Sequence, residues 1–169
     1  NVVIGNNAVN IATTGRRNVV VGDNADLAAG TDIQSVVLGY NATGNGNYTV
    51  TLGNSSTTGL HCQVQTISAL SDKRDKTNIE DSEYGLDLID SLKPVTFEWN
   101  QRDGNRKGLK DLGFIAQDLQ ESDDEFLQLV NDNNPDKLQA SYGRLIPVLV
   151  KAIQELRQEI RDCKNCKNN

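Results

Sequence analysis

Short runs of β-branched and aliphatic residues recur at nearly equal intervals through the first seventy residues. Each run holds about four residues and is closed by a turn sequence that begins with Gly; the copies are Asn1–Ala8, Asn18–Ala25, Ser35–Ala42 and Thr49–Ser56. The spacing between successive glycines is 17, 17 and 14 residues, at Gly5, Gly22, Gly39 and Gly53. Because Gly and Asn supply the positive φ angles of tight turns, the pattern predicts four short strands, each followed by a turn.

Such short strands cannot bury an apolar face alone, so the copies must stack on one another. The only aromatic residues here are Tyr40 and Tyr48, so the core of a single stacked chain would be thin. Three intertwined chains would bury the aliphatic positions better and would remove open sheet edges. We therefore expect a trimeric β-prism or β-helix, with a single-chain β-solenoid as the alternative. The repeat resembles those of trimeric adhesin heads and phage tail-fibre shafts.

Beyond residue 80 the periodicity changes to that of a small α+β unit. Asp81 or Ser82 is expected to cap a short helix that ends before Pro94, and residues 95–100 alternate like a half-buried strand. A polar turn over residues 101–110 leads to an expected partner strand at 112–116. A second helix is expected to start at 117–120, and another short strand at 126–130, followed by a loop over 131–136.

The last segment has the clearest helical pattern. From Leu145 to Cys163, apolar residues recur at alternating spacings of three and four, at Ile146, Leu149, Ile153, Leu156, Ile160 and Cys163. This spacing is typical of a coiled-coil seam of about two and a half heptads. The alternative is an amphipathic helix that packs on its own core. Ile at a with Leu at d favours a coiled coil of two helices. The seam therefore supports association of chains, but it does not by itself support a trimer.

The two halves of the chain differ in charge, and the composition argues against two classes of function. Residues 1–70 contain three acidic and two basic residues, whereas residues 71–169 contain 20 and 15, and the net charge is −6. An acidic chain argues against nucleic-acid binding, because neutralising phosphates requires clustered Lys and Arg. No apolar run is long enough to span a membrane. The chain begins in mid-pattern and contains no Met, so we expect it to be part of a longer protein. We place the module boundary between Leu70 and Ser71.

Two other motifs carry little chemistry. Cys163 and Cys166 form a CxxC, but a structural zinc site needs about four ligands and the chain has a single His, so thiols at a helix end are the preferred interpretation. No cofactor and no metal is expected. Three sequons, at Asn41, Asn47 and Asn54, fit glycosylation or glycan binding, but turn chemistry within a repeat explains them better.

The second half carries four sequence blocks in order: Ser71–Ile79, Leu92–Trp99, Gly113–Asp118, and Tyr142–Pro147 continued by Val150–Leu156. These blocks resemble the endosialidase-type C-terminal intramolecular chaperone, the peptidase S74 family. With the repeat in front of it, the chain is similar to the C-terminal part of a phage tail spike or neck appendage protein. The resemblance implies a homotrimeric chaperone that folds its own N-terminal shaft, in the host cytoplasm, and then cuts itself off. It also implies a virion location for the shaft, and a parent protein that contacts host cell-surface glycan.

The family uses a Ser-Lys dyad at the module boundary, and its Ser and Lys match Ser71 and Lys76. Asp72 and Asp75 are auxiliary candidates, and the resemblance places the cut beside Ser71, at the Ser71–Asp72 bond. A neutral lysine can take the proton of a serine hydroxyl where burial lowers the pKa of the ammonium group. In an extended chain, the two residues would lie roughly 16 Å apart, so they can meet only through a turn or between subunits.

The position of the cut is not fixed by the chemistry of the residues. Attack of Ser71 on its own carbonyl would close a strained four-membered ring. Attack on the preceding carbonyl is an N→O shift that cleaves Leu70–Ser71 instead, and attack by Ser71 of another subunit avoids the strain. All three routes stay open.

Two other classes of function compete with self-cleavage. A non-cleaving structural or adhesive trimeric fibre tip is the main alternative. A glycan-hydrolysing enzyme would need two carboxylates facing a groove. It is disfavoured because the only carboxylates of the repeat, Asp23, Asp26 and Asp32, do not follow its phase.

Overall fold

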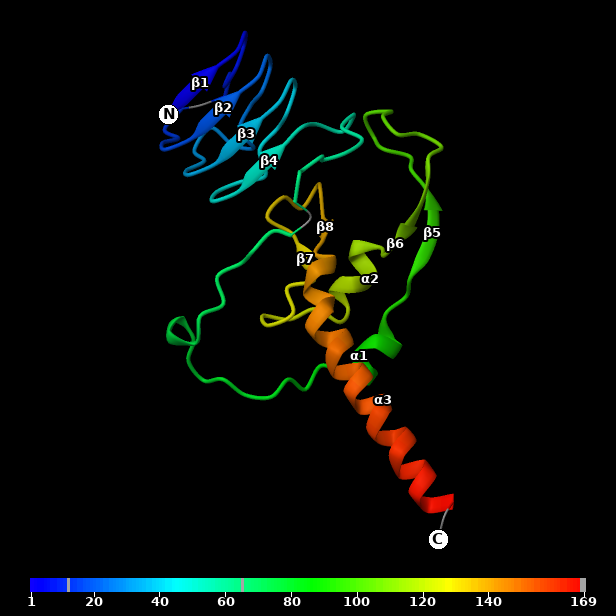
Figure 1. Cartoon of the computed structure of the whole chain (residues 1–169). Helices are drawn as coiled ribbons and strands as arrows, with labels where there is room; N and C mark the ends of the chain where they lie inside the picture. Colours follow the sequence, from blue (N-terminus) through cyan, green and yellow to red (C-terminus); the bar gives the residue numbers. More distant parts are fainter. Residues whose placement is uncertain (12, 65, 168–169) are drawn as a thin grey trace. The chain divides into compact units, whose positions relative to one another are not determined.

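The computed structural model describes residues 1–11, 13–64 and 66–167 (Figure 1). The chain divides into two compact units. The first comprises Asn1–Leu60, Phe97–Asp111 and Asp132–Lys137, and the second comprises His61–Thr96, Leu112–Asn131 and Leu138–Asn169. The predicted module boundary at Ser71 lies a short way into the second unit. Overall, the protein has α+β structure and ends in one long helix.

The repeat forms a four-stranded parallel sheet in chain order. Its strands are β1 (Val2–Ile4), β2 (Val19–Val21), β3 (Val36–Leu38) and β4 (Val50–Leu52). The register follows the sequence repeat, because Val2 pairs with Val19, Val19 with Val36, and Val36 with Val50. All four predicted strands are therefore present, each three residues long.

The turns after these strands use the predicted residue types. Gly5, Gly22 and Gly39 have φ between 130° and 145°, and Asn7, Asn24 and Asn41 have φ between 52° and 55°. The sequon asparagines serve the turns too: Ile33 N donates to Asn47 Oδ1 at 2.9 Å, and Asn54 Nδ2 donates to the carbonyl of Tyr40 at 2.8 Å. These contacts agree with the turn interpretation of the Asn-rich composition.

The core of the repeat sheet is small and partly polar. Its buried apolar residues come from the inward positions of β2 and β3 and from the turns that follow, namely Val20, Ala25, Leu27, Val37 and Ala42. The amide of Asn18, which is 2% exposed, accepts from Ser35 N at 2.9 Å and donates to the carbonyl of Asp32 at 2.7 Å. A buried amide thus replaces a backbone partner between neighbouring repeats.

Two two-stranded sheets follow in the remainder of the chain. β5 (Val95–Glu98) pairs with β6 (Lys110–Gly113), and β7 (Val130–Asn131) pairs antiparallel with β8 (Gln139–Ala140). The half-buried alternation expected for residues 95–100 is confirmed at Val95, Phe97 and Trp99. The partner strand begins two residues earlier than predicted. The prediction of a strand at 126–130 is wrong except at its last residue.

Three helices accompany these strands: α1 (Leu86–Ser91), α2 (Ala116–Gln120) and α3 (Leu145–Lys167). The predicted cap of the first helix at Asp81 or Ser82 is wrong, since its N-cap is Gly85 and has no side-chain cap. Instead, Leu86 N donates to Glu155 Oε2 of α3 at 2.8 Å. A carboxylate 69 residues away in sequence therefore caps α1. No helix within the described ranges is both long and apolar enough to span a membrane.

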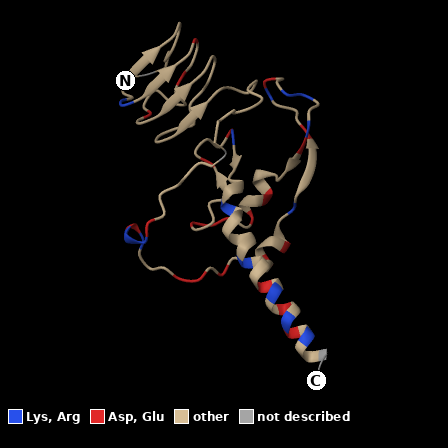
Figure 2. Ribbon diagram, viewed as in Figure 1, with Lys and Arg blue, Asp and Glu red and all other residues tan. Residues whose placement is uncertain are grey.

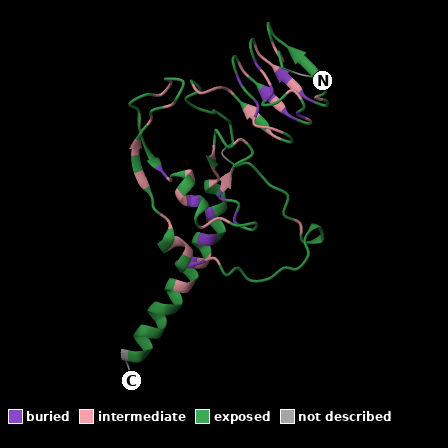
Figure 3. Cartoon of the chain, turned by 180° about the vertical axis from the view of Figure 1, so that it is seen from behind, coloured by how far each residue is buried: buried purple, intermediate pink, exposed green. Residues whose placement is uncertain are grey.

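The second unit has its own core, to which α3 contributes only its first half. The buried residues are Leu119, Leu127, Leu129, Leu145 and Val148. Figure 3 shows the burial falling away along α3, so that its C-terminal half is exposed on all sides. The helix thus packs on its own core through Leu145, Val148 and Ala152, a different face from the predicted seam.

Candidate active site

A single turn of 3-10 helix follows Ser71 and organises the predicted site. It spans Lys73–Asp75, with Asp72 as its N-cap. Two backbone hydrogen bonds close it, from Asp75 N to Asp72 O and from Lys76 N to Lys73 O, each 3.2 Å long. The turn shortens the path of the chain here, so residues on its two sides approach each other.

The turn brings the two predicted dyad residues into direct contact. Lys76 Nζ donates to Ser71 Oγ at 2.6 Å, within one chain. The separation of roughly 16 Å expected for an extended segment is thus removed by local structure. This is the nucleophile-to-base geometry required for a lysine to take the hydroxyl proton of a serine.

Asp72 is bound to Arg74. Its Oδ1 accepts from the backbone N–H of Arg74 at 2.9 Å, and its two carboxylate oxygens pair with the Arg74 guanidinium. The hydrogen bonds to Arg74 hold the pKa of the Asp72 carboxyl below its usual value. Asp75 is exposed, and its backbone N–H donates to the carbonyl of Asp72.

Arg74 was missed as a candidate by the sequence reasoning. The available signal was its opposite charge two residues after Asp72, but a pair so close in sequence is ordinary in a solvated turn. Only the three-dimensional structure shows that the two side chains make paired hydrogen bonds.

Ser71 and Lys76 are both exposed in the single chain. Exposure matters because a lysine that acts as a general base must be neutral, and removal from water is what favours the neutral amine. The single chain therefore supplies the contact between nucleophile and base but not the desolvation.

Metal-ligand chemistry finds no support in the described parts of the chain. There, no three His, Cys, Asp or Glu side chains gather as metal ligands would. Cys163 and Cys166 are exposed free thiols near the end of α3.

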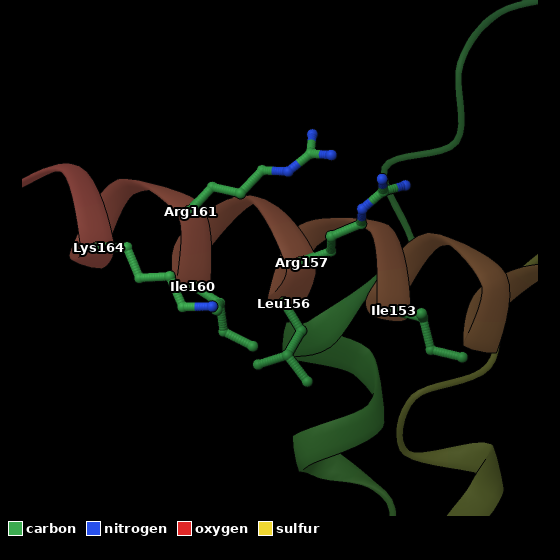
Figure 4. A pocket seen from close by; sticks show the side chains of 6 residues that line it. All are labelled: Ile153, Leu156, Arg157, Ile160, Arg161 and Lys164. Carbon is green, nitrogen blue, oxygen red and sulfur yellow. The ribbon is translucent and has the colours of Figure 1, made fainter.

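One face of α3 presents a second candidate surface. Its seam residues Ile146, Leu149, Ile153, Leu156 and Ile160 are 46% to 64% exposed. Figure 4 shows Ile153, Leu156 and Ile160 along a shallow groove on one side of the helix, with Lys164 reaching back toward Ile160. Charged residues of both signs alternate along the C-terminal part of α3 (Figure 2). The predicted seam is thus apolar, continuous and uncovered in the single chain.

Comparison with known proteins gives the same family as the sequence blocks. Residues 71–128 match the family model Peptidase_S74, described as "Chaperone of endosialidase". The chain is also 34% identical over 96 residues to the "Long tail fiber protein Gp37" of Enterobacteria phage M1, and to the protein of the same name of Enterobacteria phage Ox2. In both cases the match covers 56% of this chain and 38% of the relative. No solved structure matches the chain.

The chain spans well under half of the length of these tail fibre proteins, and the family match begins at the candidate nucleophile, Ser71. Residues 71–128 are therefore similar to the chaperone-of-endosialidase domains of the peptidase S74 family, and part of the chain is similar to long tail fibre proteins of phages.

Proposed function

We propose that residues 71–169 form an intramolecular chaperone that trimerises, folds residues 1–70 as a β-prism or β-solenoid shaft, and then releases itself by autoproteolysis beside Ser71. The observation that carries the proposal is the 2.6 Å contact between Lys76 Nζ and Ser71 Oγ at the first residues of the family match. The shaft would remain in a virion tail fibre after assembly in the host cytoplasm. Contact with host glycan would belong to the longer parent protein.

Homo-oligomerisation through α3 is supported by the exposed seam and by the charges beside it. With Ile146, Ile153 and Ile160 at a, the e positions carry Arg157 and Lys164 and a g position carries Glu159. In a parallel, in-register bundle, Glu159 faces Lys164 of the next helix, because g pairs with the following e. An antiparallel arrangement would oppose like charges. The charge pattern therefore favours parallel copies of this chain.

The outer face of the repeat sheet supports the same association. The residues on either side of the buried central positions form two aliphatic ladders along the four strands: Val2, Val19, Val36 and Val50, and Ile4, Val21, Leu38 and Leu52. Their members are exposed or half-buried in the single chain. Two adjacent aliphatic ladders facing water are unfavourable, and packing against copies of the same sheet would bury them.

Cleavage at Ser71–Asp72 requires a Ser71 from a neighbouring chain. Lys76 takes the proton from Ser71 Oγ, and the oxygen attacks the Ser71 carbonyl of the neighbour to form an ester. The amine of Asp72 then leaves with that proton, and water hydrolyses the ester. The alternative within one chain is an N→O shift at Leu70–Ser71, after which hydrolysis of the ester breaks the chain one residue earlier. Trimerisation would also exclude water from Lys76, and so favour its neutral form.

A disposable chaperone suits an intertwined β shaft. Strand pairing between chains has high contact order and is slow, and short repeats can pair in the wrong register. A module that trimerises first raises the local concentration of the strands and aligns them. Its removal afterwards closes the route back to the unfolded state, so the shaft becomes kinetically stable.

The test is intact and native mass spectrometry of the wild-type chain beside Ser71→Ala and Lys76→Ala. We expect two wild-type fragments, and one uncleaved trimeric chain in each variant. Fragments 1–71 and 72–169 would identify attack between chains, whereas 1–70 and 71–169 would identify the N→O shift. An intact wild-type trimer would reject the protease and favour the non-cleaving fibre tip. An intact monomer would reject both.

A further inference from the structure

Arg74 and Asp72 make three hydrogen bonds across the turn between Ser71 and Lys76. Arg74 N and Nε donate to Asp72 Oδ1 at 2.9 and 3.0 Å, and Nη2 donates to Oδ2 at 2.6 Å. The guanidinium thus binds both carboxylate oxygens, which fixes the geometry more tightly than a single contact would. Asp72 is the least exposed residue of the segment, with a side chain 35% exposed against 89% for Arg74.

These contacts fix the conformation on which the Ser71–Lys76 contact depends. The Asp72 carboxylate caps the 3-10 turn, whose last backbone bond runs from Lys76 N to Lys73 O. Without that turn, the backbone would extend and the two dyad side chains would separate. A short turn with only two backbone bonds is weak on its own, so side-chain bonds contribute much of its stability.

The same pair removes an electrostatic obstacle to catalysis. The charged groups beside Lys76 are Asp72, Lys73, Arg74 and Asp75, all from its own segment. Among the described residues, no hydrogen bond or ion pair joins Lys76 to a charged group of another element. A free Asp72 carboxylate would stabilise the ammonium form of Lys76, which cannot accept a proton. In the structure that carboxylate is bound by the Arg74 guanidinium, which compensates its charge.

We infer that Asp72 and Arg74 are positioning residues for the proposed self-cleavage. Their ion pair stabilises the turn that holds Lys76 against Ser71, and it keeps the Asp72 carboxylate from pairing with Lys76. The inference rests on the proposed function. Neither residue touches a reacting atom, so both act through the dyad.

The test is the pH dependence of the rate of single-turnover cleavage. The full chain is pulse-labelled during cell-free synthesis, and its cleavage over time is measured by gel and mass analysis. Arg74→Ala frees the carboxylate, so we expect the pH of half-maximal rate to rise by about half a unit to one unit. Cleavage near neutral pH then slows about threefold to tenfold. Adding Asp72→Asn to Arg74→Ala should move the pH profile back toward the wild type. Lys73→Ala, which removes an equal charge from the same turn, should shift it by less than half as much.

A second measurement does not depend on cleavage. In the uncleaved Ser71→Ala chain, the Asp72 carboxyl should titrate below the ordinary aspartate range, and Arg74→Ala should return it toward that range by carboxyl NMR. Equal Asp72 titration in both chains, or equal pH profiles for Arg74→Ala and Lys73→Ala, would overturn the inference while leaving the protease intact. A wild type that does not cleave would overturn both.

Discussion

Individual aspartates decide the local structure between α2 and β7. Asp123 accepts from Leu129 N and Val130 N at 2.7 and 2.9 Å, and Asp124 Oδ1 accepts from Phe126 N and Leu127 N, both at 2.9 Å. Because carboxylates satisfy these backbone donors, the apolar run at 126–130 folds as turns instead of the strand that its composition suggested.

The other oxygen of Asp124 forms a short bond with Tyr84. Tyr84 OH donates to Asp124 Oδ2 at 2.5 Å. This hydrogen bond raises the pKa of Tyr84 to about 12 and lowers the pKa of Asp124 below its usual value. A raised tyrosine pKa means that the neutral phenol is favoured by folding. The stability it contributes is therefore complete below about pH 10, the pKa of an unfolded tyrosine, and is lost as the pH rises through about 12.

We predict that one of the four tyrosines of the native chain ionises later than the others. Ultraviolet titration of tyrosinate should show a component near pH 12 that disappears in Tyr84→Phe. Tyr48→Phe, which removes an exposed tyrosine, is the control and should leave that component in place. A Tyr84→Phe chain that keeps the late component would show that the hydrogen bond is absent in solution.

Among the elements, the repeat sheet depends on a column of glycines. A Cβ at Gly5 would lie 2.4 Å from the carbonyl oxygen of Gly22, and a Cβ at Gly22 would lie 2.3 Å from that of Gly39. The strands can stack at this spacing only if these positions carry no side chain. The glycines were predicted from turn chemistry, but their steric role arises from the stacked neighbours.

Gly22→Ala and Gly46→Ala separate these two roles. Both glycines have positive φ, 145° and 95°, but nothing lies within 4 Å of a Cβ at Gly46. Gly46→Ala should lower the free energy of unfolding by about 1 to 2 kcal/mol, because alanine is strained at this backbone angle. Gly22→Ala adds a clash with backbone that cannot move away, so we expect a loss above about 3 kcal/mol. Both losses of stability can be measured by urea unfolding in the uncleaved Ser71→Ala background. Equal losses for the two variants would contradict the steric role of the stacked glycines.

The N-terminus of the short helix α1 is capped by a residue that is distant in the sequence. Gly85 leaves its N-terminus without a side-chain cap, and Glu155 of α3 occupies that position. A Cβ at Gly85 would lie 2.0 Å from Glu155 Oε2, so the glycine also makes room for the carboxylate. Sequence reasoning looked for the cap within a few residues and could not find one so far along the chain.

At the scale of the whole molecule, the uncovered surfaces are the main feature. The seam of α3 and the aliphatic ladders of β1–β4 both lack partners within the described chain, although the core of each unit is filled. The association of identical chains proposed above, with α3 parallel and in register, would cover both surfaces.

The native Cys163 provides a test of that arrangement, because it occupies the next d position after Leu156. In parallel, in-register helices the Cys163 thiols face each other, so mild oxidation with copper phenanthroline should join chains in pairs. The double variant Cys62→Ser/Cys166→Ser should still crosslink, and Cys163→Ser should not. Crosslinking that persists in Cys163→Ser, or none in the double variant, would contradict the parallel register.

The sequence by itself determined the features that depend on local spacing: the four strands and their turns, the α+β character of the second half, the start of α3 at Leu145, and the family blocks that begin at Ser71. Short-range propensity and periodicity control these features. Only the tertiary structure decided which face of α3 is buried and that Glu155 caps α1, and only the conformation of the local turn decided that Asp72 binds Arg74 while Lys76 reaches Ser71. Each of these depends on which groups meet in space, and many pairings of side chains are compatible with one spacing along the chain.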